Sequence, residues 1–257
     1  DISDTTKKRV KELALALEYE PNTYAVQLRT RQSNVLGIMV PTIDNFFYDS
    51  FIAAVEEEAR LHGYSVMIMQ SRDKVQIETS NLLLFRKNMV MGLFASVSIE
   101  TEDMLPFHKM EEMKTPVVFF DRVPETGDYN KVCLADQIAA KIAAEAIIEK
   151  KKKNVLALFG HPHLSITRKR CTSFKEVFEK NAPQTKLTIQ YPESIAESKK
   201  AALEALQSTE RPDVVFCMGD LILIGVMYAI HELKLKVPDD IGVIGISNGL
   251  IPTMYDP

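Results

Sequence analysis

The chain of 257 residues has no tryptophan, three cysteines and ten glycines. Cys133, Cys171 and Cys217 lie far apart and are odd in number, which is typical of reduced thiols in a cytoplasmic protein and not of a disulfide framework or a zinc site. No stretch approaches the roughly 18 consecutive apolar residues of a membrane span. No charged-then-apolar leader opens the chain. We therefore expect a cytoplasmic protein without a membrane segment.

Motifs for catalysis or cofactor binding are also scarce. The sequence has no G-x-x-x-x-G-K-[ST], no G-x-G-x-x-G and no G-x-S-x-G, and ten glycines leave few candidates for a phosphate-binding loop. His161-Pro162-His163 is the one arrangement that suggests a metal, but nothing nearby in the sequence supplies further ligands. We expect no catalytic residues, no metal and no cofactor. An α/β enzyme stays as an alternative that an activity screen would test.

The composition is that of an ordinary globular protein. Apolar residues make up 46% of the chain and charged residues 26%, with a formal net charge of −4. The length suggests one large or two medium domains. The mild excess of acid gives no general reason to expect binding to nucleic acid or to membranes, so any basic surface has to be local.

Short apolar runs alternate with segments of helical spacing from residue 35 onward. The runs are VLGIMV, SVMIM, VMGLFA, VVFF, KVCLA, NVLALF, LTI, DVVFCM and GVIGI. Continuous apolar strands that alternate with amphipathic helices predict parallel sheets with helices on both faces. The predicted fold class is therefore α/β, with Rossmann-like lobes.

One connection breaks the alternation. Residues 121–131 join two predicted strands without a helix, and a new series of strands and helices begins after them. This divides the chain into an N-terminal lobe, residues 35–135, and a C-terminal lobe, residues 136–257. The carboxyl ends of the strands then face a cleft between the lobes, where ligands of open parallel sheets bind. Polar residues stand at these strand ends: Asp121, Arg122, Asp136, His161, Asp220, Ser247 and Asn248.

Residues 1–34 have a different character. DISDTTKKRVKELALALEY has helix-start chemistry at Ser3 or Asp4 and predicts a helix over residues 5–17. NTYAVQLRTRQSN follows, with two arginines, no acid and few apolar side chains. A short polar helix costs more to nucleate than it recovers in water, so we expect this segment to need a partner in order to fold. The abrupt ends of the sequence indicate an excerpt of a longer protein.

The order and spacing of these features resemble the LacI/GalR family of bacterial transcription regulators. DISDTTKKRVKELALALEYEPN is similar to the third helix of the family's DNA-binding head, and Ala25 and Leu28 occupy the places of its A-x-x-L hinge. Further matches are PVVFFDR, the crossover from Val132 to Asp136, Arg170-x-x-x-Phe174, FCMGD and VPDDIGVIGIS. The resemblance covers essentially the whole chain. It implies a two-lobed, periplasmic-binding-protein-like core, preceded in residues 1–34 by a remnant of a helical DNA-binding head.

The resemblance implies a sequence-specific DNA-binding regulator, a repressor, that acts on operator DNA as a homodimer. In the family, two hinges fold together on DNA, and a pair of leucines wedges into the minor groove. By this resemblance the hinge contacts to DNA are Asn22, Ala25, Leu28 and Arg29. The alternative is a surface linker in which Leu28 packs locally. The first two helices of the helix-turn-helix head are not in this sequence, so direct readout of an operator needs residues outside it.

The resemblance also places a small-molecule effector, a sugar or a related metabolite, between the lobes. The residues in contact positions are Phe47, Tyr48, Arg122, Asp136, Arg170, Asp220, Ser247 and Asn248. Arg170 is expected to grip a hydroxyl or a carboxylate, with little part in core packing. The alternatives are Phe47 as a core residue, Asp220 as a cap of the following helix and Arg170 as a solvated charge.

Two departures from the family pattern leave the nature of the effector open. Ser247 stands where members that bind sugars usually carry Asp, and Glu193 stands where an aromatic residue is common, so stacking on a sugar has little support. A solute-binding protein with the same core and no DNA role is the alternative from another functional class. It would carry a secretory leader and no hinge, and residues 1–34 argue against it.

Overall fold

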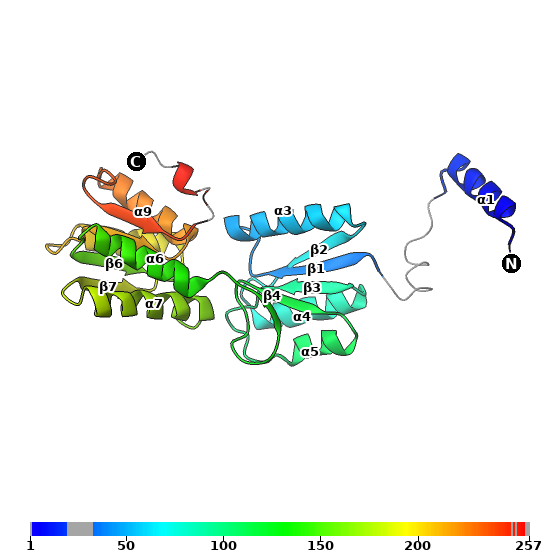
Figure 1. The fold of residues 1–257 in the computed structure, drawn as a ribbon, viewed down its shortest axis with the longest axis horizontal. Coiled ribbons are helices and arrows are strands. Elements are labelled where there is room, and N and C mark those ends of the chain that lie inside the picture. Colours follow the sequence, from blue (N-terminus) through cyan, green and yellow to red (C-terminus); the bar gives the residue numbers. More distant parts are fainter. Residues whose placement is uncertain (1, 20–32, 248, 250, 255–257) are drawn as a thin grey trace.

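The computed structural model describes residues 2–19, 33–247, 249 and 251–254. It contains two separate parallel sheets, each flanked by helices, which follow one another along the long axis of the molecule (Figure 1). The predicted α/β class with two Rossmann-like lobes is confirmed. The division between residues 135 and 136 stays a proposal, and helix α6 (Asp136–Glu149) begins there.

The N-terminal lobe is built on a five-stranded sheet with strand order β2-β1-β3-β4-β5. Neighbouring strands run parallel; Ile38, for example, pairs with Ile68 on one side and with Phe94 on the other. The strands are β1 (Val35–Val40), β2 (Ser65–Gln70), β3 (Gly92–Ala95), β4 (Val117–Phe120) and β5 (Asn130–Val132). The helices are α3 (Phe46–Leu61), α4 (Val75–Lys87) and α5 (Leu105–Glu112).

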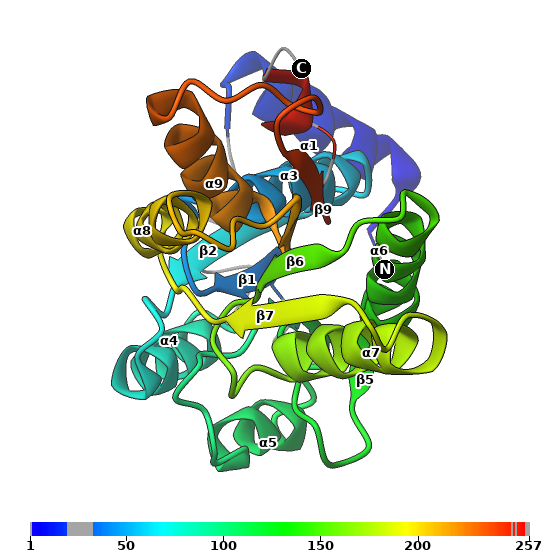
Figure 2. The ribbon, with the colours of Figure 1, turned by 90° about the vertical axis from the view of Figure 1, so that its left-hand side faces the viewer.

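The C-terminal lobe is built on a four-stranded sheet with strand order β7-β6-β8-β9. The strands are β6 (Asn154–Leu158), β7 (Lys186–Gln190), β8 (Val214–Cys217) and β9 (Gly242–Gly245). After α6, the helices are α7 (Ser165–Asn181), α8 (Ile195–Leu206), α9 (Asp220–Glu232) and the short 3₁₀ helix η1 (Ile251–Met254). Helix α6 packs against α7, and α8 packs against α9. The α6–α7 pair covers one face of the sheet and the α8–α9 pair covers the other (Figure 2).

The connection between the two sheets follows the prediction in part. No helix lies between β4 and β5, as expected for residues 121–131. The sequence predicted a strand over KVCLA, residues 131–135, and its length is wrong. Strand β5 ends at Val132, and Leu134 beyond it is 58% exposed. Helix α5 was not anticipated from the sequence. Its eight residues are too few to show a clear helical period.

The first helix, α1 (Asp4–Ala16), confirms the predicted helix at the start of the chain. Ser3 is its N-cap, and its side chain accepts a hydrogen bond from the backbone N–H of Thr6 at 3.3 Å. None of the helix residues is buried, and Val10 and Leu13 are at least 60% exposed. The helix therefore has no packing partner among the described residues.

Each lobe has its own hydrophobic core. The C-terminal lobe packs β6 and β8 around a group of aromatic rings that includes Phe159, Phe174 and Phe216. The N-terminal lobe has one cluster on each face of its sheet, one around Phe85 and Phe107 and the other around Tyr48 and Phe120. Separate cores allow the lobes to move as units relative to each other.

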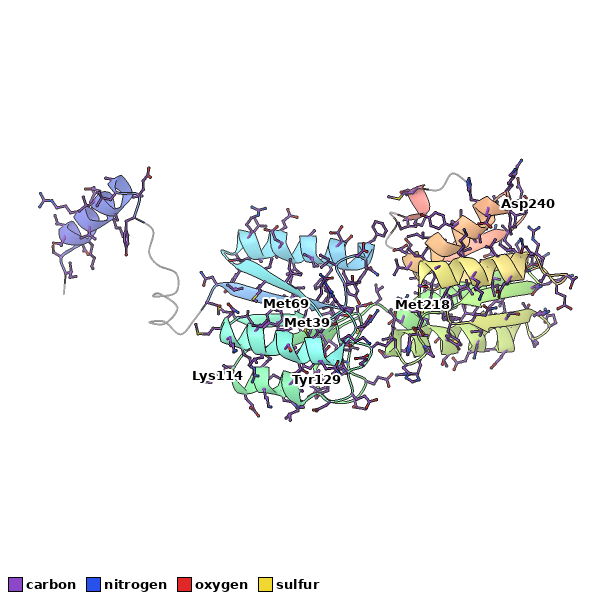
Figure 3. The ribbon with its side chains drawn as sticks, turned by 180° about the vertical axis from the view of Figure 1, so that it is seen from behind. Met39, Met69, Lys114, Tyr129, Met218 and Asp240 are labelled. Atoms are coloured by element: carbon purple, nitrogen blue, oxygen red, sulfur yellow. The ribbon has the colours of Figure 1, made fainter. Side chains whose placement is uncertain are left out.

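The carboxyl ends of the strands in both lobes point toward the other lobe. Helix α6 begins beside the N-terminal lobe and runs away from it. Strand β6 therefore begins at the end of the C-terminal lobe that is distant from the N-terminal lobe and runs back toward the N-terminal lobe. Figure 3 shows Met218, directly after β8, on the side of the C-terminal lobe that faces the N-terminal lobe, with Asp240 at the opposite end. We call the region where the strand ends of the two lobes meet the lobe boundary.

Among the described residues, no helix combines the length and the apolar character needed to cross a membrane. All three cysteines have free thiols. Cys133 is exposed, whereas Cys171 and Cys217 are buried.

Candidate functional site

Arg170 and Asp136 form a buried ion pair on the C-terminal side of the lobe boundary. The Arg170 Nε donates to Asp136 Oδ1 at 2.9 Å, and its Nη2 lies 2.8 Å from the same oxygen. The Arg170 Nη1 donates to the backbone carbonyl of Met218 at 2.7 Å. The side chains are only 6% and 5% exposed. The expectation that Arg170 has little part in packing is therefore wrong, because its guanidinium joins α7, the first turn of α6 and the end of β8.

Arg122 is also paired within its own lobe. Its Nη1 donates to Asp73 Oδ1 at 2.5 Å, and its side chain is 20% exposed. Although burial opposes its charge, the neighbouring Tyr48, Asp73 and Asp121 raise the pKa of Arg122. Arg122 therefore stays charged and holds the loop after β2 against the end of β4.

A third arginine joins the two lobes. Arg168 lies in the first turn of α7, and Glu125 lies in the loop between β4 and β5. The Arg168 Nη2 donates to Glu125 Oε1. The Arg168 Nη1 also donates to the backbone carbonyl of His163 at 2.6 Å. The sequence analysis did not single out this pair, because the two residues are 43 positions apart and neither belongs to a motif.

Tyr48 and Asp121 form a hydrogen-bonded pair on the N-terminal side. The Tyr48 hydroxyl donates to Asp121 Oδ2 at 2.7 Å and lies 3.1 Å from Ser96 Oγ. Burial, together with the Asp121 charge, raises the pKa of Tyr48 well above its ordinary value. Burial likewise raises the pKa of Asp121, although the Tyr48 hydroxyl acts in the opposite sense. Asp121 adopts a left-handed backbone with φ of 57°, which turns the chain at the end of β4.

Asp220 stands at the end of β8, where the chain enters α9. The N-cap of that helix is Gly219, and no side chain caps it. The alternative in which Asp220 caps the helix is therefore wrong. Its Oδ1 is buried and has no hydrogen-bond partner among the residues that the structure describes. A carboxylate oxygen in this position can accept a hydrogen bond from a ligand.

The remaining predicted effector contacts are placed as follows. Phe47 is half-buried and its ring lies 5.4 Å from that of Tyr48, edge to face, which agrees with a partly structural role. Ser247 follows β9, and its Oγ accepts from the backbone N–H of Gly249 at 3.1 Å. Asn248 lies outside the described residues, as do the predicted DNA contacts Asn22, Ala25, Leu28 and Arg29.

Two residues that the sequence analysis missed lie at the lobe boundary. Phe46, the first residue of α3, packs against the hydrophobic cluster of the C-terminal lobe and so touches the other lobe. Tyr191 follows β7 directly and is 39% exposed. A hydrogen bond between the Tyr191 hydroxyl and the Cys171 thiol, 3.5 Å apart, raises the pKa of Tyr191 to about 12. Tyr191 therefore supplies an aromatic ring two residues before Glu193, where the sequence analysis found none.

His161 and His163 lie close together without forming a metal site in the described part of the chain. Their ring centroids are 5.2 Å apart, and His161 Nε2 lies 3.6 Å from Glu193 Oε1. No group of three or more His, Cys, Asp and Glu side chains that could hold a metal ion occurs among the residues that the structure describes.

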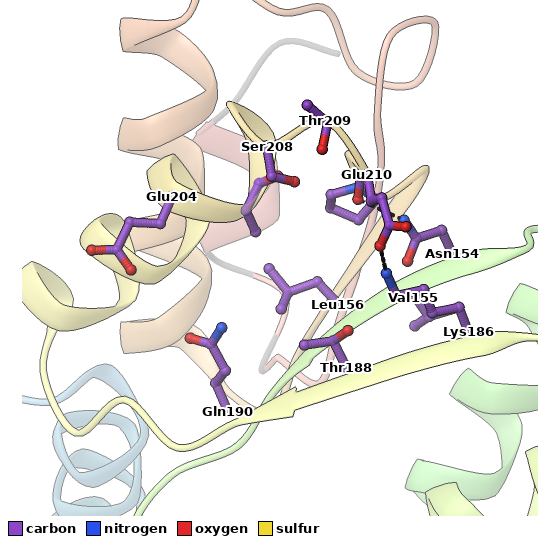
Figure 4. Close-up of a pocket in the computed structure, with 12 residues that line it drawn as sticks. Asn154, Val155, Leu156, Lys186, Thr188, Gln190, Glu204, Ser208, Thr209 and Glu210 are labelled. Carbon is purple, nitrogen blue, oxygen red and sulfur yellow. Dashed lines mark hydrogen bonds and ion pairs between the residues drawn. The ribbon is translucent and has the colours of Figure 1, made fainter.

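A pocket of about 350 Å³ lies on the C-terminal lobe, between the end of α8 and the strands β6 and β7 (Figure 4). It is lined by Lys186, Thr188 and Glu204, among others, and a Lys186–Glu210 ion pair closes one side. None of the predicted site residues lines it. A ligand there would touch one lobe only, so it could not favour one arrangement of the two lobes over another.

Two parallel α/β lobes whose strand ends meet at a polar boundary define the class of two-lobed ligand-binding proteins. The chain belongs to the periplasmic binding protein domain family, whose model matches residues 36–253. Curated relatives of the chain are LacI-family regulators, which confirms the resemblance seen in the sequence. One of them, the ribose operon repressor of Halalkalibacterium halodurans, is 25% identical over 98% of this chain and 76% of its own length.

Solved structures confirm the fold. A putative ribose operon repressor from Burkholderia thailandensis matches with a TM-score of 0.75 at 24% identity, over 88% of this chain and 84% of that one. The periplasmic binding component of an arabinose transporter from Shewanella sp. ANA-3 matches with a TM-score of 0.76 at 20% identity, over 83% of this chain and 74% of that one. At these identities the likeness shows the architecture alone.

Proposed function

We propose that the protein is a cytoplasmic, sequence-specific DNA-binding transcription regulator, a repressor, that is controlled by a small molecule bound at the lobe boundary. The observation that carries this proposal is the extent of the match to a curated repressor. The match covers 98% of the chain and therefore includes most of residues 1–34, which lie ahead of the two-lobed core. A binding protein without a DNA role has no need of that segment.

The arrangement of the lobes supports control by a ligand. Phe46 and the Arg168–Glu125 pair are contacts between the lobes, so the lobes have a defined mutual arrangement. A ligand that touches both lobes shifts the population toward closure by as much as its affinities for the two arrangements differ. Closure in turn changes the spacing of the segments that precede β1 in the two subunits of a dimer, and thereby the affinity for DNA.

The hinge assignment gives the test of the DNA role. By the resemblance to LacI/GalR regulators, Leu28 wedges into the minor groove and makes no phosphate contact. Leu28→Ala in the intact protein is expected to weaken binding to an operator selected from random DNA much more than binding to bulk DNA. Equal losses on both kinds of DNA, measured by fluorescence anisotropy, would contradict the assignment. Leu28→Met, which keeps an apolar side chain of similar volume, is the matched control.

A solute-binding protein with no DNA role is the second candidate. The observation that favours it is the structural match to the arabinose-transporter component, which is as close in fold as the matched repressor. This candidate predicts ligand binding with no selective DNA binding by the intact protein. Selection of a defined operator sequence by the intact protein would exclude it.

A further inference from the structure

Arg168 joins two loops that belong to different lobes. One loop, between β6 and α7 of the C-terminal lobe, contains His161-Pro162-His163. The other is the helix-free connection between β4 and β5 of the N-terminal lobe, which contains Glu125. The Arg168 Nη1 donates to the backbone carbonyls of Pro162 and His163, and its Nη2 donates to Glu125 Oε1. A single guanidinium therefore bridges the two loops across the lobe boundary.

The C-terminal half of this bridge is fixed within its own lobe. The Arg168 Nη1 lies 2.6 Å from the carbonyl oxygen of His163 and 3.3 Å from that of Pro162. The loop is held in turn, because the backbone N–H of His163 donates to His161 Nδ1 at 3.3 Å and His161 Nε2 lies 3.6 Å from Glu193 Oε1. A guanidinium whose direction is already set by backbone carbonyls loses little freedom when it meets a carboxylate.

The N-terminal half is also supported from within its lobe. The Lys131 Nζ, in β5, donates to the backbone carbonyl of Pro124 at 2.6 Å, directly before Glu125. The same ammonium lies 5.6 Å from the centre of the Tyr129 ring. The Tyr129 hydroxyl is 2.9 Å from His108 Nε2 in α5. The backbone beside Glu125 is therefore tied to β5 and, through Tyr129, to α5.

The bridge can influence how the lobes lie relative to each other. The helix pairs α4–α5, α6–α7 and α8–α9 each pack within one lobe, and each lobe has its own core. An exposed ion pair ordinarily contributes little, since ordering two long side chains offsets their attraction. The side chains of Arg168 and Glu125 are 46% and 52% exposed, but each is already positioned by its own loop. A few-fold preference between two lobe arrangements is within the range of such a pair.

We propose that Arg168, Glu125 and the two loops that support them form a latch, which holds the lobes together before any ligand binds. The latch acts on the arrangement of the lobes and not on folding, because both of its halves are anchored within their own lobes. Since both side chains are about half exposed, salt screens their attraction, and a higher ionic strength loosens the latch. The latch concerns the free protein and does not depend on the proposed DNA role.

Glu125→Gln tests the latch, since it removes the charge and keeps the size of the side chain. Pulsed EPR on the intact protein measures the distance between spin labels on α5 and α7, attached at Glu111→Cys and Glu179→Cys in a Cys133→Ser background. Labelled chains are diluted into unlabelled protein, so that the distance within one chain is read. At about 50 mM salt, Glu125→Gln is expected to raise the ratio of separated to closed lobes about two- to fivefold.

Glu125→Arg extends the test, because it places two guanidinium groups side by side and is expected to separate the lobes further. The matched control is Glu232→Gln. Glu232 pairs with Lys199 at 2.7 Å and is 53% exposed, but both residues belong to the C-terminal lobe. This variant should keep the distance distribution of the wild type.

Salt gives the second arm of the experiment. Raising the salt to about 1 M should move the wild type toward the distribution of Glu125→Gln and leave that variant as it was. Unchanged distances in both Glu125→Gln and Glu125→Arg would overturn the latch. Equal changes in Glu125→Gln and Glu232→Gln would overturn it as well, because the effect would then follow from the lost charge and not from the bridge. Neither DNA nor a ligand is present, so either failure leaves the proposed function standing.

Discussion

Arg170 connects three elements of the C-terminal lobe through its guanidinium. Its partners, Asp136 and the Met218 carbonyl, are buried with it, so neither acceptor can turn to water if the arginine is removed. The effect of a substitution is then dominated by the acceptors left behind and not by the lost contact alone. A boundary arginine in this position supports the site by fixing the start of α6 and the end of β8.

Arg170→Ala is expected to destabilise the protein by roughly 3–5 kcal/mol, because it leaves the Asp136 carboxylate buried without a partner. Urea denaturation followed by circular dichroism measures the change. Arg168→Ala is the matched control; its side chain is 46% exposed, so its loss should cost less than about 1 kcal/mol. Equal stability losses in the two variants would contradict the structural role of Arg170.

Asp121 gives a pH-dependent prediction. Burial raises the pKa of Asp121 in the folded protein, so the proton stabilises the fold at low pH, and this stabilisation is lost as the pH rises through the folded pKa. Asp121→Asn cannot titrate and keeps an acceptor for the Tyr48 hydroxyl. The variant should therefore be more stable than the wild type near about pH 7, with a difference that shrinks toward about pH 4. A difference that does not depend on pH would show that the carboxylate is not penalised by burial.

Helices α8 and α9 approach each other closely at Gly225. A Cβ atom added at this glycine would lie 2.5 Å from the backbone oxygen of Ile195 and 2.6 Å from the Cβ of Ser198. Both are fixed parts of α8, so the helices would have to move apart. The absence of a side chain at this position sets the packing of one face of the C-terminal lobe.

Gly225→Ala is expected to destabilise the protein by about 1–3 kcal/mol, the usual range for overpacking in a well-packed region. Gly219→Ala, six residues earlier at the start of α9 and with nothing within 4 Å of the added Cβ, is the control and should change stability less. Thermal unfolding of both variants checks the prediction. A neutral Gly225→Ala would mean that the two helices are not held at this distance in solution.

The regular elements could largely be predicted from the sequence, and the short ones could not. Long apolar runs such as β1 and β6, and the helix α1 with its Ser3 cap, follow from periodicity and capping chemistry. Helix α5 and the limits of β5 do not, because a segment of eight or three residues has too few positions to show a period. The side-chain partners of Arg170 are likewise invisible in the sequence, since Asp136 and Met218 are 34 and 48 positions distant.

The sequence predicted where in the fold the candidate site residues lie, but not which side chains they pair with. Parallel strands bring their carboxyl ends to one edge, which correctly collects Asp121, Arg122 and Asp220 at the lobe boundary. Phe46 and the Arg168–Glu125 pair were missed, because contacts between lobes depend on their mutual arrangement and leave no periodic signal.

The proposed DNA role predicts a homodimer. One hinge supplies a single leucine, whereas the minor-groove wedge implied by the resemblance needs two, related by a twofold axis. Light scattering at micromolar concentration should give twice the mass of one chain for the intact protein. A monomeric mass under these conditions would contradict the dimer and with it the paired hinges.

The DNA affinity of the intact protein, with and without a sugar that raises its Tm, tests whether a ligand at the lobe boundary controls DNA binding. Anisotropy titrations on the selected operator should give an affinity that changes by about 5- to 150-fold on saturation with the sugar, the usual range of coupling between two sites. The same coupling should appear in reverse, as an equal change in sugar affinity when operator DNA is bound. A sugar that binds at the lobe boundary and leaves operator affinity unchanged would contradict control of DNA binding by the ligand and would favour a solute-binding protein.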